Sequence, residues 1–367
     1  MRTLQQNYQN QDRFFANAFE ILEQGIARRA FPGATVAVTH QGKLVALKGF
    51  GRFTYETNSP QITPDIVFDL ASVSKVIATT SMAMILYERG LLDLDAPVAG
   101  VVPEFAKDND DPRRSEITFR MLLAHSSGLP AHEKLYLNAK SREELIAAAM
   151  RVPLKAEPGS HAEYSDIGFI VLGVALERVA EEPIDRFCQR EVFGPLGMTQ
   201  TMFNPPAAWK VRIPPTADDQ TFRKRIIQGE VYDENASVMG GVAPHAGLFA
   251  TATNVAIFAQ AMLNGGAPIV RAEALTLFTR QQSSPPETSR ALGWDTPSSP
   301  SQSGKYFSPS SFGHLGYTGT SLWIDPERQL SVTLLTNRSW PDCANQVIKE
   351  VRPQFYDAVV QALGLRS

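Results

Sequence analysis

The stretch Phe68-Asp69-Leu70-Ala71-Ser72-Val73-Ser74-Lys75 is the one around which the rest of the chain is organised. It runs directly into the apolar segment 76–79, so we predict that a helix begins near Ser72. A serine three positions before a lysine on a helix places both side chains on one face. The lysine amine can then take the serine proton, provided that its pKa falls well below the free value of about 10.4. Taken alone, the four-residue motif also fits a serine that caps an ordinary helix.

Strand patterns occur on both sides of this helix, toward the two ends of the chain. Two strands joined by Gln41-Gly42 predict a β-hairpin before it, and three further strands follow much later. An amphipathic helix is predicted near each terminus. The predicted strands span residues 34–40, 43–48, 314–318, 321–325 and 330–336, and the terminal helices span residues 14–29 and 343–363. We therefore predict an α+β fold with one central antiparallel sheet, built from both chain ends and flanked by the terminal helices.

The middle of the chain has a different pattern. From the Ser72 helix to about residue 230, predicted helices are separated by proline and glycine breaks, and strand patterns are nearly absent. We predict a discontinuous sheet domain formed by residues 1–75 and 240–367, with a mainly helical domain, residues 76–239, inserted into it. The active site is expected at their interface. Residues 283–311 are crowded with serine and proline, which is typical of a long surface loop or of the rim of a binding site.

Composition excludes several classes of protein. The chain has 367 residues, of which 43% are hydrophobic, and its net charge of −3 favours neither nucleic acid nor an anionic membrane surface. The two cysteines, Cys188 and Cys343, lie far apart without metal-type spacing, which excludes a disulfide scaffold. The six histidines are scattered and form no HExxH pattern, so we expect neither a metal nor another cofactor. His125 and His245 are expected to be structural.

The location of the protein is predicted from what the sequence lacks. The N-terminal residues have no apolar core of a signal peptide, and no apolar run is long enough to span a bilayer. We expect a cytoplasmic protein, or a periplasmic or secreted one if a leader has been removed. The expected partner is a small-molecule or peptide substrate, and the oligomeric state stays open.

Two further motifs give the first one its meaning. Tyr164-Ser165-Asp166 and His314-Leu315-Gly316 follow the Ser72 motif in the order that the serine β-lactamase and penicillin-binding-protein superfamily uses. With the flanking segments 118–130 and 313–326, the chain resembles the class C β-lactamase and D-alanyl-D-alanine carboxypeptidase branch of that superfamily. The resemblance covers about residues 14–363.

This resemblance implies a role for each matching residue. Ser72 would attack a carbonyl and form an acyl-enzyme, with Lys75 or Tyr164 as the base. Tyr164 would also pass a proton to the leaving group. The backbone N–H groups of Ser72 and Tyr317 would form the oxyanion hole, and Gly316 would let the substrate lie close to an edge strand.

Two positions depart from the family's motifs. Asp166 replaces an asparagine, and an ionised Asp166 near Lys75 would favour the protonated lysine. His314 replaces a lysine that binds the substrate carboxylate, and a histidine is mostly uncharged at neutral pH. The second change argues against efficient β-lactam hydrolysis.

The resemblance predicts a serine hydrolase that cleaves amide or ester bonds. Segments 233–236 and 240–249 are similar to a subgroup associated with cell-wall recycling, which favours muropeptides that contain D-Ala, and small esters are the other substrate class. The alternatives are a weak β-lactamase and a non-hydrolytic sensor that is acylated and stalls.

Overall fold

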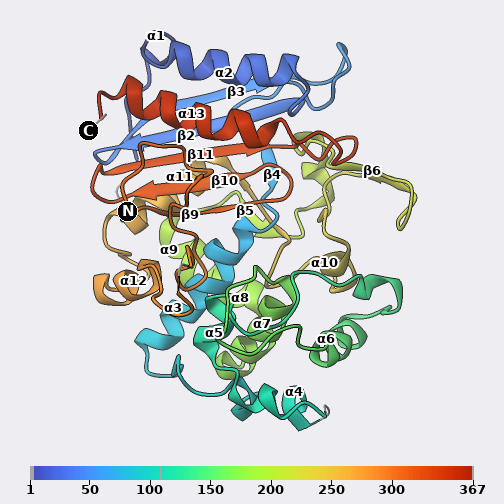
Figure 1. Ribbon diagram of the computed structural model, residues 1–367. Helices are drawn as coiled ribbons and strands as arrows, with labels where there is room; N and C mark the ends of the chain where they lie inside the picture. The colour runs from blue at the N-terminus through green and yellow to red at the C-terminus, as the bar shows by residue number, and fades with distance from the viewer. Residues whose placement is uncertain (1–3, 108–109, 287, 366–367) are drawn as a thin grey trace.

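The computed structural model describes residues 4–107, 110–286 and 288–365. Its largest sheet has six strands in the order β1-β3-β2-β11-β10-β9, drawn from both chain ends (Figure 1). The strands are β1 (Gln5–Gln6), β2 (Gly33–His40), β3 (Lys43–Gly51), β9 (Phe312–Leu315), β10 (Ser321–Asp325) and β11 (Leu330–Thr336). The predicted hairpin and the three late strands are confirmed, although β9 begins two residues earlier than predicted and ends at Leu315 rather than at residue 318, because residues 317–319 form a turn. The sheet is not wholly antiparallel, however, because the unpredicted two-residue strand β1 pairs parallel with β3.

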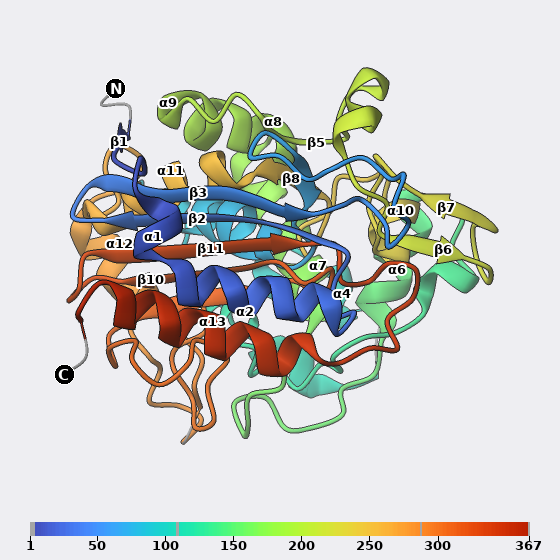
Figure 2. The ribbon, with the colours of Figure 1, turned by 90° about the horizontal axis from the view of Figure 1, so that it is seen from above.

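Helices cover both faces of this sheet. Helices α2 (Ala16–Ala27) and α13 (Ile348–Ala362) lie side by side on one face, and α11 (Ala252–Leu263) packs against the other (Figure 2). Because side chains alternate along a strand, Val36 and Val38 pack under the terminal helices whereas Ala37 joins the core under α11. The predicted terminal helices are therefore confirmed, although α13 begins at Ile348 rather than at residue 343.

Residues 76–239 contain most of the other helices, as predicted. The remaining α-helices are α1 (Gln11–Phe14), α3 (Ser81–Glu88), α4 (Glu104–Lys107), α5 (Phe119–Leu123), α6 (Arg142–Arg151), α7 (Asp166–Ala180), α8 (Ile184–Cys188), α9 (Gly194–Leu196), α10 (Glu234–Val238) and α12 (Ala272–Thr279). Short 3₁₀ helices are η2 (Val98–Gly100), η3 (Pro112–Glu116), η4 (Leu135–Leu137) and η6 (Ala207–Arg212), and η1 (Lys75–Thr80) and η5 (Gln189–Phe193) are π-helical turns. The division into two domains stays a prediction.

Short strands also occur outside the predicted strand positions, both within residues 76–239 and on either side of that segment. A three-stranded sheet has the order β4-β8-β5, and a two-stranded sheet pairs β6 with β7. These strands are β4 (Val67–Asp69), β5 (Thr201–Phe203), β6 (Ala217–Asp219), β7 (Arg225–Ile227) and β8 (Leu248–Thr251). Strands of three or four residues are too short to establish an alternating pattern, and they are defined by partners that are distant in sequence. Among them, β4 leads directly to Ser72.

The helix after Ser72 is not uniform. The predicted single helix begins with the wider π-helical turn η1 and continues as α3 to Glu88. Such π-turns are frequent at functional sites. In residues 283–311, apart from residue 287, which lies outside the described residues, the chain forms a loop with only isolated bridges, as predicted. No helix among residues 4–107, 110–286 and 288–365 has the length and apolar character needed to cross a bilayer.

Candidate active site

A buried turn at the end of β4 holds Ser72. The carboxylate of Asp69 accepts the Ala71 N–H at 2.8 Å and the Tyr232 N–H at 2.6 Å. Ala71 has a φ of +46°, a left-handed conformation that is uncommon for a residue other than glycine. Burial raises the pKa of Asp69 to about 6, although both backbone N–H groups oppose this shift. The residue before Ser72 is thus held in a strained conformation, as is common at functional sites.

Lys75 is fully buried, and its side chain contacts three oxygen atoms. Its Nζ lies 3.2 Å from Ser72 Oγ, 2.6 Å from Asp166 Oδ1 and 2.9 Å from the backbone oxygen of His245. Ser72 and Lys75 are therefore in contact, as expected from their spacing of three residues. Burial lowers the pKa of Lys75, whereas the charge and hydrogen bond of Asp166 work against this shift.

Tyr164 approaches the same serine from the start of α7. Its Oη lies 2.6 Å from Ser72 Oγ and 3.1 Å from Asp166 Oδ1. Ser165 caps α7 by accepting the Gly168 N–H at 2.9 Å, which fixes the turn that carries Tyr164. Burial and the charge of Asp166 raise the pKa of Tyr164 well above its ordinary value, so the phenol is protonated at neutral pH.

Asp166 is the carboxylate nearest to the reacting groups. Burial by itself would raise the pKa of Asp166, but the Lys75 charge and the nearby His132 ring, whose Nδ1 lies 3.9 Å from Asp166 Oδ2, outweigh burial and lower it. Asp166 is therefore ionised and paired with Lys75, which is the condition under which the sequence predicts that it favours the protonated lysine.

Two histidines expected to be structural are buried beside these groups. The His125 ring packs against Phe169 and Tyr164, and its Nδ1 accepts the Ser165 N–H at 3.0 Å. The ring of His245 lies 2.9 Å from Asp233. Neither histidine lines the cavity beside Ser72.

The third motif lies at the edge of the main sheet, where β9 ends at Leu315. His314 Nδ1 donates to the backbone oxygen of Leu315 at 2.7 Å, and Nε2 has no hydrogen-bond partner among the described residues. Burial, followed by the charges of Lys75 and Arg290, lowers the pKa of His314 to about 3. His314 is therefore neutral at pH 7.

Gly316 and Tyr317 complete this strand end. A Cβ atom on Gly316 would lie 2.0 Å from Thr320 Oγ1 and 2.5 Å from the Leu70 backbone oxygen. The structure thus requires a glycine at position 316 because of close contacts within the protein itself. The reason predicted from the sequence was instead the close approach of the substrate. The Tyr317 ring is half-exposed and stacks on Tyr232. Among the described residues, no backbone hydrogen bond is donated by the N–H of Ser72 or Tyr317.

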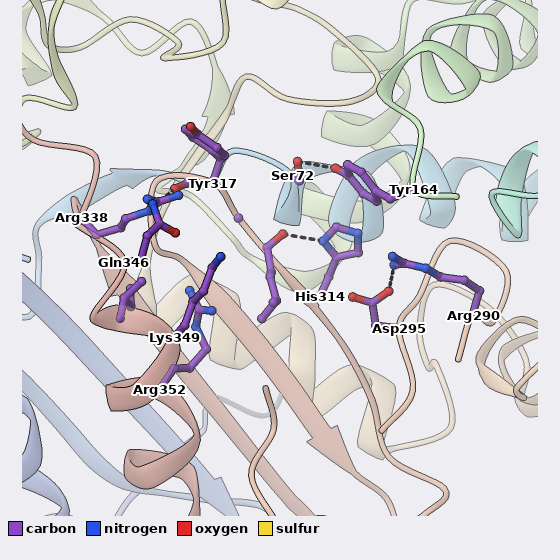
Figure 3. A pocket seen from close by; sticks show the side chains of 13 residues that line it. Ser72, Tyr164, Arg290, Asp295, His314, Tyr317, Arg338, Gln346, Lys349 and Arg352 are labelled. Carbon is purple, nitrogen blue, oxygen red and sulfur yellow. Dashed lines mark hydrogen bonds and ion pairs between the residues drawn. The ribbon is translucent and has the colours of Figure 1, made fainter. Parts of the chain in front are cut away.

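A cavity of about 280 Å³ opens beside Ser72, Tyr164 and the third motif (Figure 3). Sequence reasoning missed the four basic residues that line it: Arg290, Arg338, Lys349 and Arg352. Arg290 pairs with Asp295 on one side of His314, and the other three gather on the opposite side. Those three form no ion pair within the described part of the chain.

For one of these basic residues, Arg352, the sequence pattern could have indicated a buried charge. Arg352 interrupts the apolar face of α13, where Val351 and Phe355 are buried in the core. A charge on the buried face of a helix needs a polar partner, and Arg352 donates to Gln302 at 3.0 Å. Arg338 instead follows β11 and donates to the Tyr317 backbone oxygen at 2.7 Å.

One group of side chains has metal-ligand spacing. His132, Asp166 and Asp233 place ligand atoms within 4.8 Å of one another. Asp166 is already bound by the buried Lys75, whose charge would oppose a cation at the same carboxylate. The donor set therefore fits the lysine ion pair better than a metal.

A fully buried lysine in contact with a partly exposed serine, which a partly exposed tyrosine also contacts, defines the class of β-lactamases and penicillin-binding proteins. A family profile described as "Beta-lactamase" matches residues 18–349, and the chain belongs to this family.

Relatives and solved structures agree with this assignment. The chain is 32% identical to "N-acetylmuramyl-L-alanine amidase" of Bacillus subtilis (strain 168), over 87% of this chain and 80% of that protein. It is 30% identical to "Putative D-alanyl-D-alanine carboxypeptidase" of Escherichia coli (strain K12), over 84% of this chain and 79% of that protein.

Among solved structures, "EstCE1, a hydrolase with promiscuous acyltransferase activity" superposes with a TM-score of 0.77 at 23% identity, over 95% of this chain and 99% of that one. A penicillin-binding protein homologue from Pyrococcus abyssi gives a TM-score of 0.74 at 22% identity, over 96% of this chain and 78% of that one. At these identities the two structures support the fold alone. The family and the relatives support a serine hydrolase in general terms.

Proposed function

We propose that this protein hydrolyses amide or ester bonds through an acyl-enzyme on Ser72. The observation that carries the proposal is the pair of contacts to Ser72 Oγ, one from Lys75 Nζ at 3.2 Å and one from Tyr164 Oη at 2.6 Å. A nucleophile within hydrogen-bond reach of a base, which a third group orients, is the arrangement that covalent catalysis requires.

Lys75 is the proposed base. Its burial favours the neutral amine, whereas the raised pKa of Tyr164 opposes a standing phenolate. Ser72 Oγ attacks the carbonyl carbon as its proton moves to Lys75 Nζ. The proton then passes through Tyr164 Oη to the leaving nitrogen or oxygen as the old bond breaks. Water releases the acyl group by the reverse proton path.

The oxyanion hole is proposed to be the backbone N–H groups of Ser72 and Tyr317. Neither group donates a hydrogen bond to the described protein, so both are free to bind a developing negative charge. Ser72 also precedes η1, and the N-terminal end of a helix favours negative charge.

The charge of the cavity favours an anionic substrate. His314 is neutral and cannot replace the family's lysine as a carboxylate anchor. Arg338, Lys349 and Arg352 instead supply positive charge, and all three lie on the side of His314 opposite to Arg290 (Figure 3). This supports peptides with a terminal carboxylate, such as muropeptides that end in D-Ala, over small neutral esters. The names of the amidase and carboxypeptidase relatives agree with that choice.

The test compares D-Ala-D-Ala peptides, p-nitrophenyl butyrate and nitrocefin as substrates of wild type and Ser72→Ala. We expect wild type to turn over the peptides and the ester, nitrocefin to be a poor substrate, and Ser72→Ala to be inactive. Activity of Ser72→Ala equal to wild type would rule out the proposal. A stable adduct without turnover would favour the non-hydrolytic sensor.

Lys349→Met tests the substrate class. Loss of one charge-assisted contact should raise KM for the peptides by about tenfold and leave the neutral ester unaffected. Lys43→Met, on β3 and outside the cavity, is the matched control. An equal effect of Lys349→Met on both substrates would contradict the anionic substrate class.

A further inference from the structure

A second carboxylate reaches Lys75 indirectly through His245. The His245 backbone oxygen accepts a hydrogen bond from Lys75 Nζ at 2.9 Å, and the His245 ring donates from Nε2 to Asp233 Oδ1 at 2.9 Å. The His245 side chain is 1% exposed, so this contact is shielded from water. Asp233 is itself held in place because it caps α10 by accepting the Ala236 N–H at 2.7 Å.

The three contacts of Lys75 restrict how its amine can point. The Asp166 carboxylate and the His245 carbonyl can only accept, so each binds an N–H of Lys75 in either protonation state. The third position faces Ser72 Oγ. In the neutral amine that position holds the lone pair, which is the site that must receive the serine proton. An amine without the His245 contact would be free to rotate its lone pair away from Ser72.

We propose that Asp233 and His245 are positioning residues: their hydrogen bond fixes the carbonyl that directs the Lys75 lone pair toward Ser72. This inference rests on the proposed function, in which Lys75 is the base. It extends that function to two residues that do not line the cavity.

The charge of Asp233 adds an electrostatic role to the geometric one. Burial would raise the pKa of Asp233, but His245 holds it below its ordinary value, so Asp233 is ionised at neutral pH. Its negative charge stabilises the Lys75 ammonium, as does that of Asp166, whereas Arg290 opposes both. Other titratable groups near Lys75 and its two carboxylates are Tyr164, His125, His314 and His132, of which His132 lies within 4.8 Å of both Asp166 and Asp233. Removal of the Asp233 charge should therefore lower the pKa of Lys75.

Three variants separate charge from geometry, with kcat/KM for p-nitrophenyl butyrate measured across pH. Asp233→Asn keeps a side-chain oxygen for His245 and for the α10 cap but removes the charge. The acidic limb of the pH profile, where activity rises as the base loses its proton, reports the pKa of Lys75. We expect this limb to move to lower pH by about half a unit or more in Asp233→Asn. His245→Ala should lower kcat by about tenfold with little change in KM. His245→Gln keeps an N–H that can reach Asp233 and should recover most of that loss.

The matched control is Asp325→Asn. Asp325 is a buried carboxylate on β10 that accepts from Ser308 and takes no part in the Lys75 cluster. Its loss should lower thermal stability and leave the pH profile in place. The proposal fails if Asp233→Asn leaves the acidic limb unmoved, or if His245→Ala retains wild-type kcat. Ser72→Ala distinguishes a failure of the positioning role from a failure of the proposed function. Activity in Ser72→Ala would overturn the proposed acyl-enzyme on Ser72 itself.

Discussion

Asp166→Asn is the most informative single substitution in the cluster, because it restores the residue that the family's motif carries at this position. The change removes the negative charge 2.6 Å from Lys75 Nζ and keeps the size of the side chain. Since that charge stabilises the ammonium, the pKa of Lys75 should fall. The acidic limb of the kcat/KM profile, which reports the base in the free enzyme, should then move to lower pH.

The size of the shift follows from the geometry. Two unit charges 2.6 Å apart attract by about 6 kcal/mol at an effective dielectric constant of about 20. The Asp166 side chain is 16% exposed, so solvent screens part of this attraction. Contact with an opposite charge commonly shifts a pKa by about 1–3 units. We therefore expect the acidic limb to move down by about 1–3 pH units, which exceeds the shift expected for Asp233→Asn.

The assay is steady-state hydrolysis of p-nitrophenyl butyrate from pH 4 to pH 9. Glu177→Gln is a suitable control, because Glu177 lies on the same helix and pairs with Arg142 rather than Lys75. The control should leave the acidic limb in place. Lys75 would be refuted as the base if the acidic limb of Asp166→Asn stayed at the wild-type pH or moved to higher pH.

Three other substitutions test separate parts of the account. Tyr164→Phe should lower kcat about 100-fold through loss of proton transfer, while the acidic limb stays in place; a displaced limb would assign it to Tyr164. Gly316→Ala should lose activity and about 1–3 kcal/mol of stability in thermal unfolding, because the new methyl group overlaps Thr320 and Leu70. Gly100→Ala meets no atom within 4 Å and should unfold like wild type. Asp69→Asn tests linkage: the pKa of Asp69 is raised to about 6 in the folded state, so wild type loses stability as pH rises from 4 to 7. Over that range the stability of the variant relative to wild type should rise by about 2 kcal/mol in denaturant unfolding; a constant difference would contradict the raised pKa.

The main sheet was predictable because its strands carry their own signals. The hairpin around Gln41-Gly42 has the turn residues that its geometry requires, and both residues adopt positive φ. The strands β10 and β11 are fully buried, and each combines leucine with tryptophan, isoleucine or valine, which are residues typical of strands in a core. In contrast, the strands β4, β5 and β8 exist because three distant segments pair, and no local pattern in three or four residues encodes that pairing.

The site was predictable where a motif fixes the spacing. Ser72 and Lys75 are three residues apart on one helix, so local geometry alone brings them together. Tyr164 and His314 could be assigned by resemblance to the family. The basic residues of the cavity, such as Arg338, come from two separate loops and α13, and sequence spacing does not specify how these segments pack. The contact between His245 and Lys75 was missed for another reason: it uses a backbone oxygen, which every residue type has.

The central claim is that Ser72 becomes acylated and that its acyl group is then released. The most direct measurement is mass spectrometry of protein quenched in acid during turnover of p-nitrophenyl butyrate, followed by peptide mapping. We predict one butyryl group on the peptide that contains Ser72, absent from Ser72→Ala and lost once the substrate is consumed. Continued turnover with no adduct, or with the adduct on another serine such as Ser126, would contradict the account.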